Sequence, residues 1–405
     1  FGASAVARRH GSGESAGVDP RAMRIQDAHS AADLRRIARR RLPRAVFDAV
    51  EGGAGDELTL AANRAAFDRL CIRPRAFVEV RDVDLRTRAL GEAMAAPFAL
   101  APCSFARMCS SDAEPGVARA AARAGVPYVL AGGSGAPPER VAEAAAGPLW
   151  YQLYLHPDRG VTEELVDRVE AAGYRVLFLT IDTAVKPHRE RDLRNGIDLP
   201  LTITPRLALA GLRRPRWARD FLLGTDGSES PLKAATAAYD NFADAVMHIK
   251  SVTLEDLAWL RERWRGPLVV KGVLDAAAVE PMLDHGVDGI VVSNHGGRNL
   301  DSAPATLDVL PEVVAAAAGR AEVLVDGGIR RGTDIVKALA LGARACLVGR
   351  PYLHALAAGG ERGVDRLLEL LRNEVHRTMA LAGLPSVDAI DAGVVRPPDR
   401  QLEEA

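Results

Sequence analysis

A repeated alternation of short apolar runs with amphipathic stretches fills the chain from about residue 97 onward, and it constrains the fold more than any other feature. The eight runs that have the length of buried strands are residues 98–102, 128–131, 150–155, 176–182, 268–271, 289–293, 323–326 and 346–349. Most of the alanine-rich stretches between them have helical spacing, and several end in glycine, the usual helix C-cap. Such alternation predicts parallel strands joined by right-handed crossovers.

Eight strands favour an α/β fold of the closed (β/α)8 TIM-barrel type over an open doubly wound sheet. The sequence has no GxGxxG turn after the first strand, and its glycine-rich turns come late, which argues against the open sheet. A helical segment over residues 27–70 precedes the barrel as a lid or plug. We expect residues 21–395 to form one domain, between a disordered N-terminus (1–20) and a C-terminal tail (396–405).

One long insertion, over about residues 192–250, interrupts the alternation after the fourth strand. It is rich in proline and arginine and includes the run Arg213-Arg214-Pro215-Arg216-Trp217. A solvated loop is the favoured interpretation, because long insertions at the carboxyl ends of strands are usually functional or disordered loops. Leucines nearby leave a second interpretation open, a basic amphipathic segment that contacts a membrane surface.

The composition excludes several classes of partner. The net charge of the 405 residues is −1, which gives no reason to expect nucleic acid or an anionic membrane. The four cysteines, at positions 71, 103, 109 and 346, form no CxxC pair, so we expect reduced thiols in a cytoplasmic protein and no metal site. No apolar run reaches the roughly 18 residues of a membrane span, and no signal peptide is recognisable.

The sixth strand ends in the stretch most indicative of chemistry, Ser293-Asn294-His295-Gly296-Gly297-Arg298. His295 can exchange a proton near neutral pH, and Arg298 offers a planar fork that suits a carboxylate. The paired glycines allow a flat group to approach the backbone. A base and an anion clamp on one turn suit an enzyme that takes a proton from a small carboxylic acid. The alternative is a helix-capping loop with a solvated histidine and arginine.

The other strands also end in polar residues, and in a barrel these ends converge on one mouth. The candidates at the other strand ends are Ala101, Pro102, Cys103 and Ser104; Gln152 and Tyr154; Thr180, Asp182 and Arg189; Lys271; Asp326, Gly327, Gly328 and Arg330; and Gly349 and Arg350. Loops after the seventh and eighth strands form the usual phosphate site of barrels. A lysine at the same mouth can stabilise negative charge on a reduced flavin. The ring of polar ends therefore predicts a phosphorylated planar cofactor beside a carboxylate substrate.

These motifs resemble the FMN-dependent α-hydroxy-acid oxidase and dehydrogenase family, which includes glycolate oxidase, lactate monooxygenase and mandelate dehydrogenase. The resemblance covers residues 42–383 and is strongest at residues 293–298, 326–334 and 349–351. It implies FMN as cofactor, oxidation of an L-2-hydroxy acid to the 2-oxo acid, and a homotetramer. Oxygen or another electron acceptor would reoxidise the flavin.

The resemblance also implies a role for each site residue. His295 would be the base, Asp182 would stabilise its protonated form, and Tyr154 would bond the reacting oxygen. Arg298 and Arg189 would bind the substrate carboxylate. The residues implied at the cofactor are Lys271 at flavin N1 and O2, Gln152, Thr180 and Ser293 at the ring, and Gly328, Arg330, Gly349 and Arg350 at the ribityl chain and phosphate. We expect Ala101, Pro102, Cys103, Ser104, Asp326 and Gly327 to line the same cofactor site.

Two departures from the family pattern bear on the substrate. Ala49 stands where the family usually has a tyrosine that contacts the carboxylate, and Ala131-Gly132-Gly133 replaces a bulkier segment. Both changes predict a roomier pocket than that of glycolate oxidase, suited to a bulky or aryl 2-hydroxy acid. Two alternatives are an FMN-dependent barrel enzyme that acts on a larger biosynthetic substrate, such as an amine, a peptide or a natural-product intermediate, and a flavin-binding scaffold.

Overall fold

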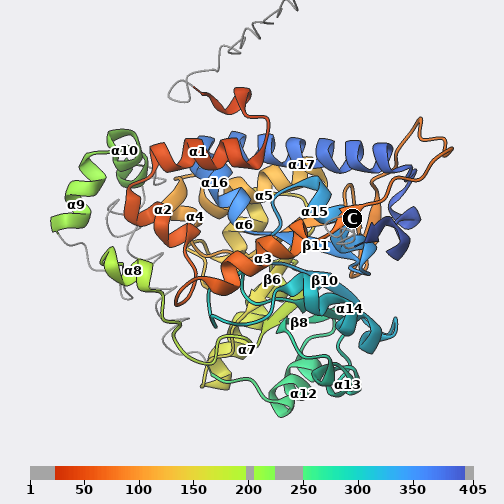
Figure 1. Ribbon diagram of the computed structural model, residues 1–405. Coiled ribbons are helices and arrows are strands. Elements are labelled where there is room, and N and C mark those ends of the chain that lie inside the picture. The colour runs from red at the N-terminus through yellow and green to blue at the C-terminus, as the bar shows by residue number, and fades with distance from the viewer. Residues whose placement is uncertain (1–22, 198–204, 224–249, 397–405) are drawn as a thin grey trace, which may run out of the picture.

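The computed structural model describes residues 23–197, 205–223 and 250–396. Eight parallel strands form a closed barrel (Figure 1), which confirms the predicted (β/α)8 fold. The barrel strands are β4 (Phe98–Leu100), β5 (Tyr128–Ala131), β6 (Leu149–Leu153), β7 (Val176–Thr180), β8 (Leu268–Val273), β9 (Gly289–Val292), β10 (Glu322–Val325) and β11 (Ala345–Val348). Each strand pairs with its neighbours in sequence, and β11 pairs with β4 to close the ring. All the strand carboxyl ends therefore meet at one mouth.

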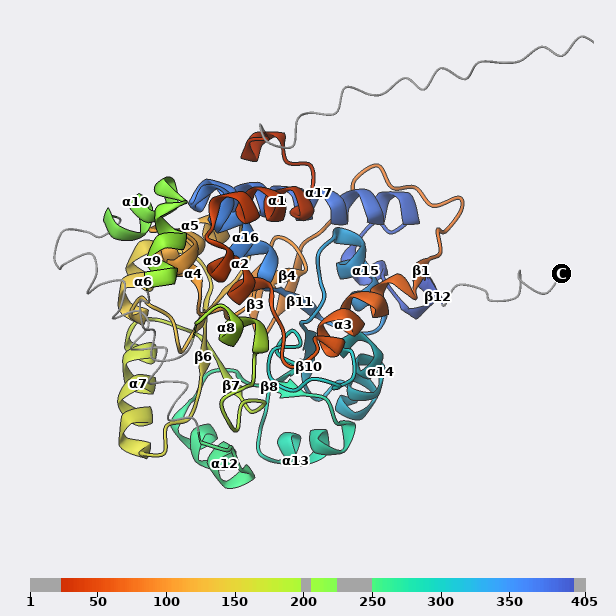
Figure 2. The same cartoon turned by 60° about the vertical axis from the view of Figure 1, so that its left-hand side comes forward.

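Helices surround the barrel. Those that follow the strands are α4 (Ala106–Cys109), α5 (Ala113–Ala124), α6 (Pro138–Ala144), α7 (Arg159–Ala171), α12 (Leu254–Arg263), α13 (Val279–Asp284), α14 (Thr306–Ala317), α15 (Gly332–Ala340) and α16 (Arg350–Gly359). The long helix α17 (Glu361–Ala382) then packs across α5, α15 and α16. Figure 2 shows α17 running beside the N-terminal helix α1 (Ala31–Arg41) along one side of the barrel.

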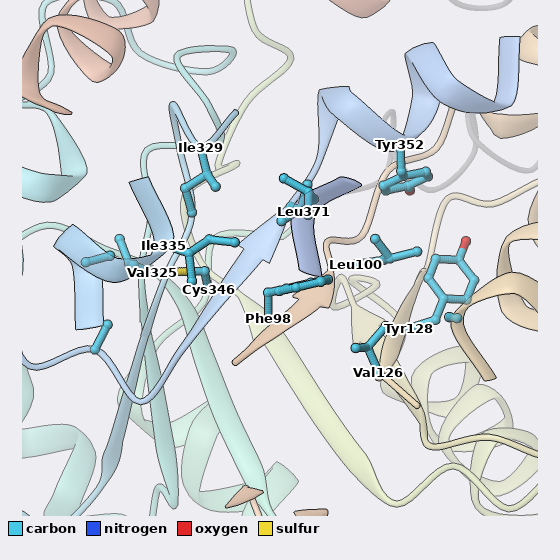
Figure 3. Close-up of a cluster of buried hydrophobic side chains, with 14 of the residues drawn as sticks. Phe98, Leu100, Val126, Tyr128, Val325, Ile329, Ile335, Cys346, Tyr352 and Leu371 are labelled. Carbon is cyan, nitrogen blue, oxygen red and sulfur yellow. The ribbon is translucent and has the colours of Figure 1, made fainter. Parts of the chain in front are cut away.

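The barrel strands separate two apolar layers, because alternate side chains point into and out of a barrel. Inside, Trp150 and Phe178 stack with ring centroids 5.5 Å apart. Outside, the strands pack against the helices, as Figure 3 shows for Phe98, Leu100 and Leu371. Apolar side chains therefore fill the interior of the barrel.

Helices α1, α2 (Arg44–Glu51) and α3 (Leu58–Asp68) precede the barrel, in the segment expected to be helical. Ser30 caps α1 by accepting a hydrogen bond from the Asp33 amide at 3.3 Å. Helices α1 and α2 are separated at Leu42 and Pro43, because proline lacks an N–H and disfavours helical backbone before it. Beyond α2, the amide of Ala54 donates to the carbonyl of Gly297 at 2.9 Å. The connection from α2 to α3 thus lies over the mouth.

The described part of the insertion is helical, so the expected solvated loop is wrong there. It contains α9 (Pro205–Leu212) and α10 (Pro215–Leu223), which follow the short helix α8 (Glu190–Arg194). Trp217 Nε1 donates to the carbonyl of Met108 at 2.8 Å, and the Trp217 ring stacks on Phe221. Trp217, which lies within an arginine-rich run, therefore anchors α10 to helix α4 of the barrel. The remainder of the insertion lies outside the described residues.

Short antiparallel strands complete the fold. β1 (Cys71–Ile72) pairs with β12 (Val395–Arg396), and β2 (Thr87–Ala89) pairs with β3 (Glu92–Met94). Arg396, expected to begin the tail, is therefore part of a strand, while residues 1–20 and 397–405 lie outside the described part. No helix within the described ranges is both long and apolar enough to cross a bilayer.

Candidate active site

A pocket opens at the carboxyl ends of the barrel strands. Together with the open space at its mouth it measures about 1040 Å³. The predicted residues that line it are Ala101, Pro102, Cys103, Ser104, Gln152, Tyr154, Thr180, Arg189, Lys271, His295, Arg298, Asp326, Gly327, Gly328, Arg330, Gly349 and Arg350. Two further predicted residues, Asp182 and Ser293, contact this lining from behind.

His295 and Asp182 form a hydrogen-bonded pair at the centre of the mouth. Nδ1 of His295 lies 2.9 Å from Oδ1 of Asp182, and the His295 side chain keeps 22% of its exposure. His295 has a left-handed backbone (φ 57°), which is strained for a residue with a side chain and turns it into the pocket. Burial lowers the pKa of His295, while Asp182 opposes that shift. Burial alone would raise the pKa of Asp182, but His295 and Lys271 hold it down at about 2.

Asn299 and Thr183 position Asp182, and sequence reasoning gave them no role. Nδ2 of Asn299 donates to the Asp182 carbonyl at 3.0 Å and to Thr183 Oγ1 at 2.7 Å. Thr183 Oγ1 donates to Asp182 Oδ1 at 3.1 Å. Asn299 follows Arg298 directly, so its place in the signature was the only available signal. Asn299 and Thr183 thus orient the Asp182 carboxylate, and this carboxylate orients the His295 ring.

Lys271 is a buried cation in strand β8, between the strands that lead to Asp182 and His295. Its Nζ lies 3.0 Å from Oδ2 of Asp326 and donates to Ser293 Oγ at 2.8 Å. Burial lowers the pKa of Lys271, but Asp326 and Asp182 more than reverse this effect and raise it above its ordinary value. Lys271 is therefore charged throughout the physiological pH range.

Unpartnered buried atoms show that the residues present fit a polar planar ligand. Gln152 Nε2 and Thr180 Oγ1 are buried, line the pocket and have no hydrogen-bond partner within the described chain. Buried polar groups are rarely left unpaired without a ligand or water, and the edge of a flavin ring carries matching donors and acceptors. Gly327 and Gly328 have left-handed backbones, and a Cβ at Gly328 would lie 2.3 Å from the Asn63 carbonyl oxygen, so this glycine permits close packing against α3. The buried, unpartnered atoms of Gln152 and Thr180 fit FMN.

Two arginines lie where the phosphate of such a cofactor is expected. Burial lowers the pKa of Arg330 to about 10, and its backbone amide donates to Asp334 Oδ2 at 2.8 Å. The guanidinium of Arg350 donates to the carbonyls of Val50, Gly296 and Gly52 at 3.0, 2.8 and 2.8 Å. Both arginines line the pocket at the end where the phosphate is predicted. The side chain of Arg350 also donates hydrogen bonds to carbonyls at the end of α2.

Arg298 and Arg189 meet on the substrate side of the pocket. Nη1 of Arg298 donates to the carbonyls of Ala49 and Gly52 at 2.8 and 2.9 Å, which satisfies oxygens at the end of α2. Nη2 of Arg298 is buried and lacks a hydrogen-bond partner in the described ranges. Arg189 Nε donates to the Arg298 carbonyl at 3.1 Å, and burial lowers the pKa of Arg189 to about 9. A carboxylate would supply the missing partner.

Tyr154 lies beside these arginines. Burial and the neighbouring Asp182 carboxylate raise the pKa of Tyr154 to about 12. Its phenol therefore stays protonated and can donate to a substrate oxygen. The described residues contain no group of three metal-binding side chains.

The pocket wall expected at Ala49 is formed by another residue. Ala49 is fully buried and is not part of the lining; Phe105 packs against the apolar cluster that contains Ala49, and it lines the pocket instead. At Gly132, a Cβ would lie 2.7 Å from the carbonyl oxygen of Gln152, so this glycine permits close strand packing and does not enlarge the pocket. Neither departure opens the site in the way the sequence suggested.

The protein-family description "FMN-dependent dehydrogenase" matches residues 38–397. An L-lactate oxidase from Nostoc sp. is 43% identical over 363 residues, which cover 89% of this chain and 95% of that protein. The human 2-hydroxyacid oxidase 2 is 39% identical over 90% of this chain and 97% of its own length.

Solved structures agree with this assignment. The crystal structure of the monotopic membrane protein (S)-mandelate dehydrogenase superimposes with a TM-score of 0.85 at 36% identity, covering 92% of this chain and all of that one. A mandelate oxidase bound to (S)-2-phenylpropionate gives 0.77 at 39% identity, covering 91% and 98%. These matches do not favour the alternative of an amine, peptide or natural-product substrate. The chain belongs to the FMN-dependent dehydrogenase family, and the predicted cofactor and reaction class, FMN-dependent oxidation of a 2-hydroxy acid, are confirmed.

Proposed function

We propose that this enzyme oxidises a bulky, preferably aryl, L-2-hydroxy acid to the 2-oxo acid. The observation that carries the substrate class is the lining of the pocket, where the Phe105 ring lies beside the unpartnered Nη2 of Arg298. An aromatic wall beside an anion clamp suits a carboxylate with a flat side chain. The similar mandelate oxidase and mandelate dehydrogenase structures support this size of substrate.

The contacts support a role for each residue. Because Nδ1 of His295 faces Asp182, this nitrogen carries the proton in the neutral ring, and Nε2 is free to accept one from the substrate. The Asp182 carboxylate stabilises the imidazolium that results. Arg298 and Arg189 hold the substrate carboxylate, and Tyr154 donates to the 2-hydroxyl oxygen. The reaction removes two electrons and two protons from the substrate.

Lys271 acts on the cofactor. When bound, FMN supplies the acceptor for the two electrons that leave the substrate. The buried ammonium of Lys271, fixed by Asp326 and Ser293, would stabilise negative charge on the reduced ring. The unpartnered atoms of Gln152 and Thr180 would hold the ring edge, while the chain around Gly328, Arg330 and Gly349 would hold the phosphate end.

The cellular location, the oligomeric state and the electron acceptor belong to the same proposal. All four cysteines are unpaired, as is usual in a reducing compartment, which supports a cytoplasmic location. The resemblance supports a homotetramer, which size-exclusion chromatography with light scattering would test. The relatives include both oxidases and dehydrogenases, so oxygen consumption during turnover distinguishes oxygen from another acceptor.

A substrate panel tests the proposal. Anaerobic mixing of the yellow holoenzyme with (S)-mandelate should bleach the flavin, and (R)-mandelate should not. We expect kcat/KM to be higher for (S)-mandelate than for glycolate or L-lactate. A higher kcat/KM for glycolate would contradict the aryl assignment, and a protein that binds no FMN would contradict the whole proposal.

A further inference from the structure

Phe105 links the apolar cluster around Ala49 to Arg298, the proposed carboxylate clamp. It follows strand β4 and precedes the short helix α4. Its ring packs against a small apolar cluster of Ala45, Ala49 and Ile197. The guanidinium carbon of Arg298 lies 5.5 Å from the centroid of the same ring. One side chain therefore contacts both the cluster that contains Ala49 and the proposed carboxylate clamp.

The contacts of Arg298 divide its donors into two groups. Nη1 is occupied by the carbonyls of Ala49 and Gly52, whereas Nη2 is buried and finds no acceptor among the described residues. The Phe105 ring covers the guanidinium and keeps water away from it. An aromatic ring stabilises a cation in this position, and it leaves donors in the guanidinium plane available. The hydrogen bonds of Nη1 and the Phe105 ring hold the guanidinium in place. In this orientation Nη2 remains available to a ligand in the pocket.

The small residue at Ala49 makes this arrangement possible. Ala49 is fully buried in α2, and its neighbours Phe105 and Ile197 occupy the adjoining space. A large side chain at this position would displace the Phe105 ring. We propose that Phe105 is a positioning residue that occupies the space beside Ala49 and fixes Arg298 for binding the substrate carboxylate. This inference rests on the proposed function, because it requires that Arg298 binds the carboxylate.

A pair of ligands of nearly the same shape, one an anion and one neutral, tests the positioning role. Benzoate and benzamide are titrated into the holoenzyme, and binding is followed by the change in flavin absorbance. In Phe105→Leu, which keeps apolar bulk without a π face, we expect benzoate affinity to fall roughly 3- to 30-fold. Benzamide affinity should change less than about twofold, and Phe105→Tyr should restore benzoate binding. Equal losses for both ligands, or no loss for benzoate, would overturn the inference.

The space beside Ala49 gives a second test that does not depend on turnover. Ala49→Tyr should lower FMN retention and the melting temperature, because the new ring meets Phe105. Adding Phe105→Ala to Ala49→Tyr should recover both. If Ala49→Tyr alone is tolerated as well as the double variant, Phe105 does not fill this space and the inference fails.

Arg298→Met tests the proposed carboxylate clamp separately from the positioning role of Phe105. If Arg298→Met leaves benzoate binding intact, the proposed clamp is wrong. If Arg298→Met abolishes benzoate binding while Phe105→Leu does not change it, the clamp stands and only the role of Phe105 is refuted.

Discussion

Nδ1 of His295 and Oδ1 of Asp182, whose residues are 113 positions apart in the chain, lie 2.9 Å from each other at the mouth of the barrel. The contact fixes which ring nitrogen carries the proton, and the left-handed backbone at His295 directs the other nitrogen toward the pocket. Histidine bases in other enzymes are oriented in the same way, by a carboxylate behind the ring. The pair is the basis for the first two predictions.

Replacing His295 by alanine should abolish substrate-driven bleaching of the flavin. The loss in the reductive rate constant should be roughly 100- to 10,000-fold, as is usual when a general base is removed. FMN content should stay near that of the parent, because His295 is not among the residues proposed to hold the ring. Stopped-flow absorbance under anaerobic conditions measures the rate, and bleaching at the parent rate would rule out His295 as the base.

Asp182→Asn should shift the pH dependence of kcat/KM. The Asp182 charge raises the pKa of His295 against the larger effect of burial, so its loss should lower that pKa further. The base then stays unprotonated to more acidic pH, and the acidic limb of the profile should move to lower pH. The maximal rate should fall, by about 100-fold, because the imidazolium loses its stabilising charge. Asn299→Ala, which removes hydrogen bonds to Asp182 but no charge, is the control and should leave the limb in place.

Lys271→Met should destabilise the fold through Asp326. Both side chains are less than one-tenth exposed, and removal of the lysine leaves a buried carboxylate unpaired. Breaking such a pair costs about 3–5 kcal/mol, which urea unfolding of the apoprotein would measure. Lys271→Met combined with Asp326→Asn should recover most of this loss, since no lone charge remains. The double variant should still have a lower flavin reduction potential than the parent; an unchanged potential would contradict the role of Lys271.

Arg298→Met and Arg189→Met should affect substrate binding to different extents. Arg298 has a buried, unpartnered donor, and a hydrogen bond to a charged group is worth about 1.5–3 kcal/mol, so KM should rise roughly 10- to 150-fold. Arg189 uses Nε on the Arg298 carbonyl, and its loss should raise KM less. Steady-state kinetics with (S)-mandelate decide this order. A larger effect at Arg189 would reverse the assignment of the principal clamp.

The barrel and its ring of polar strand ends were predictable because they depend on local patterns. Strand-length apolar runs, C-capping glycines and the signature around His295 each occupy a few consecutive residues. The barrel then brings all strand ends to one mouth, so most of the candidate site followed from the fold class. The position of Asp182 beside His295 also needed the resemblance, because the two residues come from different strand ends.

Contacts between distant segments were not predictable. Ala49 suggested an enlarged pocket, but the space beside it is filled by Phe105 and Ile197, which come from two other parts of the chain. The described insertion residues suggested a loop by their arginines and prolines, yet Trp217 anchors a helix to Met108. Tertiary packing determines both the space beside Ala49 and the contact of Trp217 with Met108. Such packing cannot be predicted from the local periodicity of the sequence.

The guanidinium of Arg350 links the covering segment to the base-bearing loop. Its three nitrogens bind carbonyls of Val50 and Gly52, at the end of α2, and of Gly296, next to His295. Arg350 itself opens α16 at the proposed phosphate end of the cofactor site. The covering segment and the base-bearing loop are thereby held by a single side chain, so the proposed cofactor site and substrate site share one structural support.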